Sequence, residues 1–149
     1  MAEKFEFCSE AWLRLAGTTL KNVVEETRDS IAGQHLSVCE RFANPPEHLT
    51  NGPHEVAWSF SIGTDGSTKI ASGILADADF TSFGDYQTVL PGVRTVFEKS
   101  PAFVEARNKA RREAVAAGRS KQEGSLDHAS LAMRLVLIEF HNRLAVRTA

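Results

Sequence analysis

The clearest pattern in the chain is an alternation of large apolar and small side chains in residues 54–62. The large positions are Val56, Trp58, Phe60 and Ile62. A period of two places these four side chains on one face of a β-strand. The Asp65-Gly66 pair that follows is typical of a hairpin turn, because glycine takes a positive φ without steric cost.

Further strands are predicted on both sides of this one. Residues 68–75 form the returning strand of the hairpin, and residues 76–82 form a third strand of the same meander, with Phe80 on its apolar side. Residues 35–43 also alternate, with Leu36, Val38 and Glu40 on one face. Because a two-stranded hairpin alone is marginal in water, we expect helices to cover the aromatic face of the sheet.

Helical periodicity appears in four segments. Residues 9–31 carry an apolar stripe, with Ser9 as the N-cap and Gly33 as the stop. A short helix over 84–90 is interrupted by Pro91-Gly92, and a helix over 101–117 follows Ser100-Pro101. The segment 126–146 is apolar over so wide an arc that we expect it to lie buried across the aromatic strand face.

The helix predicted over 101–117 has a basic side. Its cationic residues allow either a solvated surface with salt bridges to Glu105 and Glu113 or a patch that meets an anion or a lipid head group. The residues on this side are Arg107, Lys109, Arg111 and Arg112.

Composition narrows the function classes. The chain has 149 residues, 42% of them apolar, and a formal net charge of −2. This size favours one domain, and this charge predicts no nucleic-acid partner. The polar N-terminus, the lack of a long apolar run and the widely separated Cys8 and Cys39 predict a cytoplasmic protein with reduced thiols and no stable membrane insertion. The sequence indicates no oligomeric state.

Motifs for cofactors and metals are missing from the sequence. It contains no glycine-rich phosphate loop, no nucleophile elbow and no His-Glu-x-x-His. His35, His48 and His54 could approach one another, but no Cys, Asp or Glu stands near them at ligand spacing, so we predict neither a metal site nor a cofactor.

The order of elements resembles the sterol carrier protein 2 (SCP2) family. The resemblance rests on the strand-to-helix segment Asp77 to Tyr86, with its ADADFTSF, and on GRSKQEG before a helix containing LAMRL. Gly118, Lys121 and Gly124 match the family's spacing in a strand that precedes the C-terminal helix. The resemblance implies one α+β domain over residues 1–149, with strand 118–124 completing a small, mostly antiparallel sheet of about five strands and helices over one face.

The resemblance also implies an apolar tunnel between sheet and helices that holds a lipid, sterol, fatty acyl or polyketide-like molecule. The alternative is a solidly packed core without a cavity. We expect the tunnel to be lined by the aromatic strand residues and the apolar residues of the flanking helices: Trp58, Phe60, Phe80, Phe83, Tyr86, Leu90, Met133, Leu137 and Phe140.

Two other function classes remain open at this stage. A small isomerase, cyclase or hydratase could act in the same cavity if an acid–base pair projects into it, and the candidates are Asp79, Asp85, Tyr86, His54 and His141. A structural interaction module would instead show a solid core and an exposed apolar patch. The segment 83–117 is longer and more charged than the family's link, which predicts a lid over the tunnel or a fixed insertion.

Overall fold

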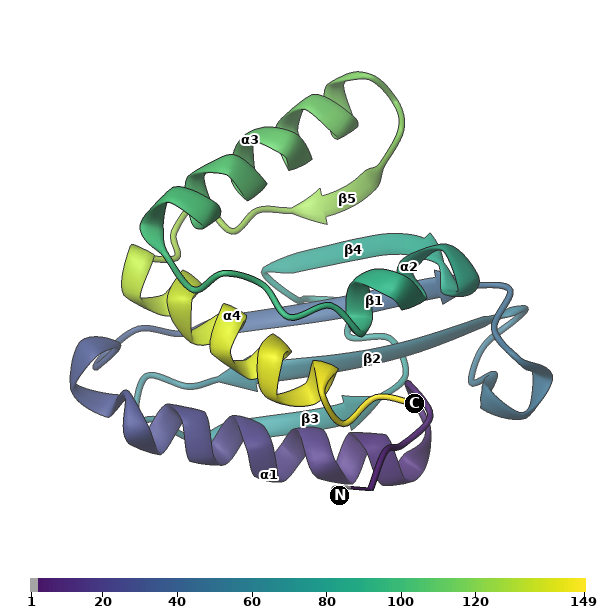
Figure 1. Ribbon diagram of the computed structural model, residues 1–149, viewed down its shortest axis with the longest axis horizontal. Helices are drawn as coiled ribbons and strands as arrows, with labels where there is room; N and C mark the ends of the chain where they lie inside the picture. The colour runs from purple at the N-terminus through teal and green to yellow at the C-terminus, as the bar shows by residue number, and fades with distance from the viewer. Residues whose placement is uncertain (1–2) are drawn as a thin grey trace.

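One five-stranded sheet organises residues 3–149, the part of the chain that the computed structural model describes (Figure 1). The strands lie in the order β3-β2-β1-β4-β5. All neighbours are antiparallel except β1 and β4, which run parallel. The predicted α+β class with a mostly antiparallel sheet is therefore confirmed. The strands are β1 (Leu36–Ala43), β2 (Glu55–Ile62), β3 (Thr68–Ser72), β4 (Phe80–Asp85) and β5 (Lys121–Gly124).

Three of the four α-helices pack on one face of this sheet, while α3 and the edge strand β5 form an arm at the β5 edge (Figure 1). The helices are α1 (Glu10–Glu26), α2 (Tyr86–Val93), α3 (Pro101–Ala116) and α4 (Leu131–Ala145), and two short 3-10 turns cover Arg28–Ser30 and Glu47–Leu49. Each α-helix begins at a residue whose side chain accepts a backbone N–H, as predicted for Ser9 and Ser100. No helix among residues 3–149 has the length and apolarity to cross a membrane.

The core lies between the helices and the face of β2 that the alternation predicted. Val56, Trp58 and Ile62 are almost fully buried there, and Phe60 lies beside them. The ring of Phe140 from α4 meets the ring of Phe60 at a centroid distance of 5.2 Å. The prediction that the last helix crosses the aromatic face is therefore confirmed.

The predicted three-stranded meander is wrong in its third strand. Strand β4 covers 80–85 instead of 76–82, and it pairs with β1, not with β3. Gly73, at φ +91°, turns the chain out of β3. The connection 73–79 then passes the sheet face opposite the core, where the Leu75 N–H donates to Cys39 Sγ. This crossing lets Phe80 join Val38 in the core, a pairing that no local pattern encodes.

Several helix boundaries also differ from the predictions. Helix α1 ends at Glu26, not near Ile31, because the Thr27 hydroxyl donates to the Val23 carbonyl and the chain tightens into a 3-10 turn. Helix α4 begins at Leu131 rather than at 126, because Ser130 caps it by accepting the Met133 N–H.

Pro91 lies inside α2 instead of interrupting it. The missing proline N–H leaves the carbonyl of Gln87 without its helical partner, and Gln87 is exposed, so water can replace the bond. The GRSKQEG segment, whose composition alone would indicate a loop, does contain β5, as the family resemblance predicted.

Candidate functional site

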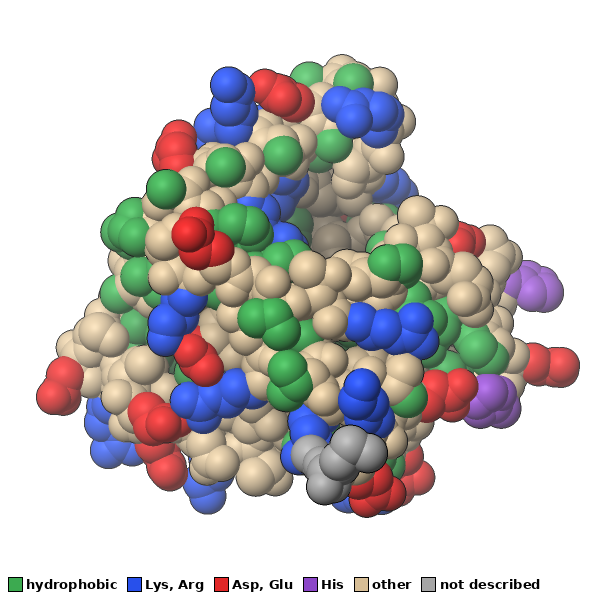
Figure 2. Space-filling view, in the orientation of Figure 1, with side chains coloured by type: hydrophobic (Ala, Val, Ile, Leu, Met, Phe, Trp, Pro, Cys, Tyr) green, Lys and Arg blue, Asp and Glu red, His purple; other side chains and the backbone are tan. Residues whose placement is uncertain are grey.

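A cavity of about 500 Å³ lies between the core face of the sheet and helices α2, α3 and α4. It opens beneath the α3–β5 arm, where Figure 2 shows a hollow with Lys or Arg atoms on its wall. Its wall is mostly apolar and aromatic, which is typical of a site for a small apolar ligand. This hollow lies beside the solidly packed part of the core around Met133.

Most of the predicted lining residues belong to the cavity wall. They are Trp58, Phe60, Phe80, Phe83, Leu137 and Phe140. Phe83 is a special case, because its register partner is Arg41 and its ring lies between the Arg41 guanidinium and Lys121 Nζ, at 5.0 and 4.3 Å from the ring centroid. Strand alternation therefore directs the Phe83 ring away from the core face.

Three predicted lining residues lie outside the wall. The Tyr86 hydroxyl donates to the carbonyl of Phe7 and its ring stacks on the Phe7 ring, so Tyr86 is a buried packing residue. Met133 is fully buried in the core, and Leu90 packs against that core from α2. Helical spacing predicted an apolar face for these residues, but it did not distinguish the solid part of the core from the hollow part.

Glu40 is the most unusual residue of the wall. Its side chain projects from β1 on the same face as Val38 and Phe42, among aromatic residues. The Trp58 indole Nε1–H donates to its carboxyl oxygen at 2.8 Å. Burial raises the pKa of Glu40 to about 6, against the opposing effects of the Trp58 hydrogen bond and of the positive charge on Arg107. The cavity therefore holds a carboxyl group that titrates near neutral pH.

Two arginines of α3 face the same cavity. Arg107 lies over the ring of Phe97 at 4.6 Å and Arg111 lies over the ring of Phe80 at 5.7 Å from the centroid. Arg107 is exposed and Arg111 is half-buried, and both line the open part of the cavity. Partial burial lowers the pKa of both groups, and each remains a cation at neutral pH.

Neither of these guanidinium groups has a carboxylate partner among residues 3–149. Arg111 donates only to the side-chain oxygen of Asn108, at 3.3 Å. The third arginine of the wall, Arg134, already has hydrogen-bond partners, because it donates to Asn108 and to the carbonyls of Leu126 and Ala129. Neither arginine therefore forms a direct ion pair among these residues, although the carboxyl group of Glu40 in the same cavity acts electrostatically on Arg107.

His141 is the only predicted acid–base candidate in the wall that residues 3–149 form. Its ring stacks on Phe97 at 4.2 Å, and Nε2 lies 2.7 Å from the Thr95 carbonyl oxygen. Burial lowers the pKa of His141, so the ring is neutral at pH 7. A neutral Nε2–H that donates to Thr95 fixes the ring in place.

The other candidates for catalysis lie elsewhere. Asp85 caps α2, and hydrogen bonds from Asn44 and Thr88 lower its pKa. Asp79 contacts His35 and His128 outside the cavity, and His54 adopts φ +55° in the loop before β2. The Tyr86 hydroxyl donates to the carbonyl of Phe7 and lies outside the cavity wall.

Sequence reasoning did not select Glu40 as a site residue, and it named Arg107 and Arg111 only as part of a basic side that could either be solvated or meet an anion or a lipid head group. The sequence did contain an indication for Glu40. A glutamate on the apolar face of an alternating strand is removed from water and requires a hydrogen-bond partner or a shifted pKa. The two arginines belong to the basic side of α3, which also carries the exposed Lys109 and Arg112. The sequence pattern did not distinguish these four residues from one another. Only the fold separates the cations that face the cavity from those that face water.

No protein-family model and no curated protein sequence matches this chain. Among solved structures, it is similar to the solution structure of a conserved hypothetical protein from Thermus thermophilus, described as a possible sterol carrier protein. The two share 18% identity over 97% of this chain and 96% of the other, with a TM-score of 0.54.

Two further structures show weaker similarity. A crystal structure of sterol carrier protein 2 shares 21% identity over 91% of this chain and 98% of its own, with a TM-score of 0.49. A UbiJ-SCP2 ubiquinone synthesis protein shares 13% identity over 91% and 89%, with a TM-score of 0.42. The chain thus has an SCP2-like fold, as the order of its elements predicted. The fold alone does not name a ligand.

Proposed function

We propose that this protein binds one long-chain amphipathic molecule with an acidic head group. The apolar chain would occupy the cavity between sheet and α4, and the head group would meet Arg107 and Arg111. The observation that carries the proposal is the pair of unpartnered guanidinium groups, among the described residues, beside an aromatic cavity of about 500 Å³. An apolar ligand alone would leave both guanidinium groups without a direct ion-pair partner.

The cavity walls favour the chain part of such a ligand. Trp58, Phe60, Phe80 and Phe140 present apolar surface to the cavity. Transfer of apolar ligand surface from water contributes about 25 cal/mol per Å², so a chain needs few polar contacts. The volume lies within the roughly 300–1,000 Å³ of small-molecule sites.

The two arginines determine which charge the site prefers in the head group of a ligand. A guanidinium can donate two parallel hydrogen bonds to one carboxylate or phosphate, which makes these charge-assisted pairs strong. Glu40 acts in the opposite direction when ionised, because its negative charge would repel an acidic head group. Its raised pKa lessens this repulsion at mildly acidic pH. We therefore expect affinity for an anionic ligand to rise as the pH falls towards about 6.

The test compares ligands that differ only in the head group. Delipidated protein is titrated with a fatty acid, the matched fatty alcohol and the matched alkylamine, with calorimetry and the fluorescence of Trp12 and Trp58, which both line the cavity, as readouts. The double variant Arg107→Gln/Arg111→Gln removes both cations, and Arg112→Gln, exposed on α3 outside the cavity wall, is the matched control. Mass spectrometry of the protein as purified identifies any lipid already bound.

Saturable one-to-one binding with a preference for the acid would support the proposal. The double variant should lose at least about a hundredfold in affinity for the acid, because it removes two charged partners whose hydrogen bonds are each worth about 1.5–3 kcal/mol. Its affinity for the alcohol should change much less. Absence of saturable binding by all three ligands, together with no co-purified lipid, would refute the proposal.

One observation favours a second function, an enzyme that transfers a proton within the same cavity. Glu40 is a carboxyl group with a pKa of about 6 in an apolar cavity, which suits a general acid or base at neutral pH. Neutral His141 lines the same wall. If the protein is such an enzyme, Glu40→Gln should abolish turnover of a bound unsaturated or carbonyl-containing ligand while ligand binding persists. A carrier would show no turnover in the wild type, and its Glu40→Gln variant would bind an anionic ligand at least as tightly as the wild type.

A further inference from the structure

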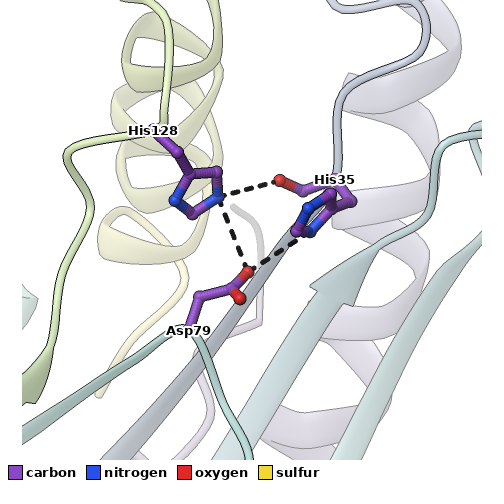
Figure 3. Close-up of side chains that lie close together, drawn as sticks. All are labelled: His35, Asp79 and His128. Carbon is purple, nitrogen blue, oxygen red and sulfur yellow. Dashed lines mark hydrogen bonds and ion pairs between the residues drawn. The ribbon is translucent and has the colours of Figure 1, made fainter.

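Two histidines and an aspartate meet at the end of the sheet, away from the ligand cavity (Figure 3). His35 precedes β1, Asp79 precedes β4, and His128 precedes α4. Because β1 and β4 are parallel neighbours with Val38 opposite Phe80, residues just before each strand lie side by side. Sequence spacing could not reveal this cluster, since 44 and 49 positions separate its members (79 − 35 and 128 − 79).

The spacing of the donor atoms suits a small divalent ion. Asp79 Oδ2 lies 3.5 Å from His35 Nδ1 and 3.6 Å from His128 Nε2. All three donor atoms lie within 4.8 Å of one another. A tetrahedral zinc ion with bonds of about 2.0–2.2 Å separates its ligand atoms by roughly 3.3 Å. Small side-chain rotations would therefore bring the three atoms into a first coordination shell.

The aspartate is already held in position. The Ser37 N–H donates to Asp79 Oδ2 at 2.9 Å, and the Asp79 N–H donates to Ser37 Oγ at 2.8 Å. The Ser125 N–H donates to the Asp79 carbonyl. Hydrogen bonds that orient a ligating carboxylate are a general feature of metal sites and raise affinity.

The cluster is open to solvent on its other side. The side chains of His35, His128 and Asp79 are 61%, 40% and 26% exposed. The two imidazole rings lie nearly parallel, with an interplanar angle of 25°. An ion could therefore enter from water and keep at least one water molecule as a ligand.

We propose that His35, Asp79 and His128 bind one Zn²⁺ ion or a related late divalent transition ion. Two imidazole nitrogens and one carboxylate are donors that Zn²⁺ accepts, whereas Ca²⁺ and Mg²⁺ require mostly oxygen ligands. The site differs from the cavity, since none of the three residues belongs to the cavity wall. The ion would tie the start of α4, which supplies part of that wall, to the starts of β1 and β4.

The alternative is that His35, Asp79 and His128 form a hydrogen-bonded network without a metal ion. His128 Nε2 lies 3.2 Å from the His35 carbonyl oxygen and can donate to it. Metal binding would replace that proton, because a ligating imidazole nitrogen must be deprotonated. Direct metal titration distinguishes the two arrangements.

The experiment uses the full chain without a histidine tag, after removal of metal with a chelator. Zn²⁺ is titrated by calorimetry and native mass spectrometry, with Mg²⁺ as the comparison. Co²⁺ absorption in the visible range reports the coordination number. The variants are His35→Ala and His128→Ala, and the matched control is His48→Ala, an exposed histidine whose ring nitrogen meets Glu6. Circular dichroism confirms folding of each variant.

We expect one Zn²⁺ per chain in the wild type and in His48→Ala, and no saturable Mg²⁺ binding. Each cluster variant should lose at least about tenfold in Zn²⁺ affinity, since loss of even an outer hydrogen-bond partner costs roughly 10–100-fold. Zn²⁺ should raise the melting temperature of the wild type but not of the double variant His35→Ala/His128→Ala. No stoichiometric Zn²⁺ binding, or equal affinity in the folded double variant, would overturn the assignment.

Discussion

The indole N–H of Trp58 donates to the carboxyl group of Glu40 at 2.8 Å across the β1–β2 pair, and both residues line the cavity. This bond gives one carboxyl oxygen of Glu40 a partner within an apolar wall. Because burial makes ionisation of Glu40 unfavourable, its pKa is raised to about 6. The same contact therefore influences both stability and ligand preference.

The first prediction concerns the pH dependence of stability. Folding raises the pKa of Glu40 from 4.5 to about 6, so the folded state holds this proton more tightly than the unfolded state. The stabilising contribution of the proton is complete below about pH 4.5 and is lost as the pH rises through 6. Ionised Glu40 then costs about 2 kcal/mol relative to its protonated form.

Glu40→Gln keeps an acceptor for Trp58 but carries no charge. The variant should exceed the wild type in unfolding free energy by about 1–2 kcal/mol above pH 7, and this difference should shrink towards about pH 5. Urea unfolding at several pH values measures it, with Glu105→Gln, exposed on α3, as the control. A difference between Glu40→Gln and wild type that does not change with pH would contradict the assigned pKa.

The second prediction concerns the link between α2 and α3. Asn142 of α4 holds it by accepting the Phe97 N–H at 2.8 Å and donating to the Phe97 carbonyl at 2.9 Å. Asn142→Ala should raise hydrogen exchange in residues 94–100 by up to about thirtyfold, since it removes two bonds worth about 1 kcal/mol each. Amides of β1 and β2 should be unaffected. Asn22→Ala, exposed on α1, is the control, and unchanged exchange in 94–100 would show that other contacts hold the link.

The third prediction tests whether residues 83–117 act as a lid. Val89, Val93, Phe97 and Val104 from this segment contribute to the cavity wall. A bound fatty acid should therefore slow hydrogen exchange in residues 83–100 while exchange in β1 and β2 changes little. Equal exchange with and without ligand, in protein shown to bind it, would favour a fixed insertion.

The fourth prediction concerns Gly124 at the end of β5. A Cβ at this position would lie in severe overlap with the Asp79 carbonyl oxygen, and φ is +70°. Gly124→Ala should lower the unfolding free energy by roughly 3 kcal/mol, from left-handed strain and the clash together. Gly118→Ala is the matched control, because it shares the positive φ but has nothing within 4 Å, and it should cost only about 1 kcal/mol. Equal losses would show that the clash relaxes.

The fifth prediction concerns the buried contact between the two ends of the chain. The Trp12 indole N–H donates to Thr148 Oγ1 at 3.0 Å, and both residues are buried. Thr148→Val keeps the shape but removes the acceptor, so it should destabilise the fold by about 1–3 kcal/mol. Thr148→Ser keeps the hydroxyl and should cost less. If the Ser and Val variants unfold at the same denaturant concentration, packing of the Thr148 methyl group contributes as much to stability as its hydroxyl group does.

Local patterns were sufficient for most of the elements. Alternation in 54–62 identified the core face of β2, and Ser9 and Ser100 identified two helix starts. The resemblance to the SCP2 family identified β5 inside a polar, glycine-bounded segment. Helix ends were less accurate, because capping by Thr27 and Ser130 competes with helical periodicity over one or two turns.

The apolar part of the candidate site was predicted residue by residue, whereas the basic side of α3 was predicted only as one of two alternatives. Aromatic residues on β2 and α4 had to share an interior, which is a direct consequence of burying apolar surface. Glu40 and the arginines of α3 could not be assigned in the same way. A charged residue in a sequence is usually solvated, and only its neighbours in space reveal a desolvated one.

The sequence by itself determined which faces are buried, where most elements begin and that the fold is a mixed α+β domain. These properties depend on residues a few positions apart, through side-chain periodicity and backbone capping. The tertiary structure alone decided that β4 crosses to pair with β1 in parallel, and this pairing brings Asp79 beside His35. It also decided that Glu40 faces Trp58 in a cavity. Such contacts join residues far apart in the chain, so no local pattern records them.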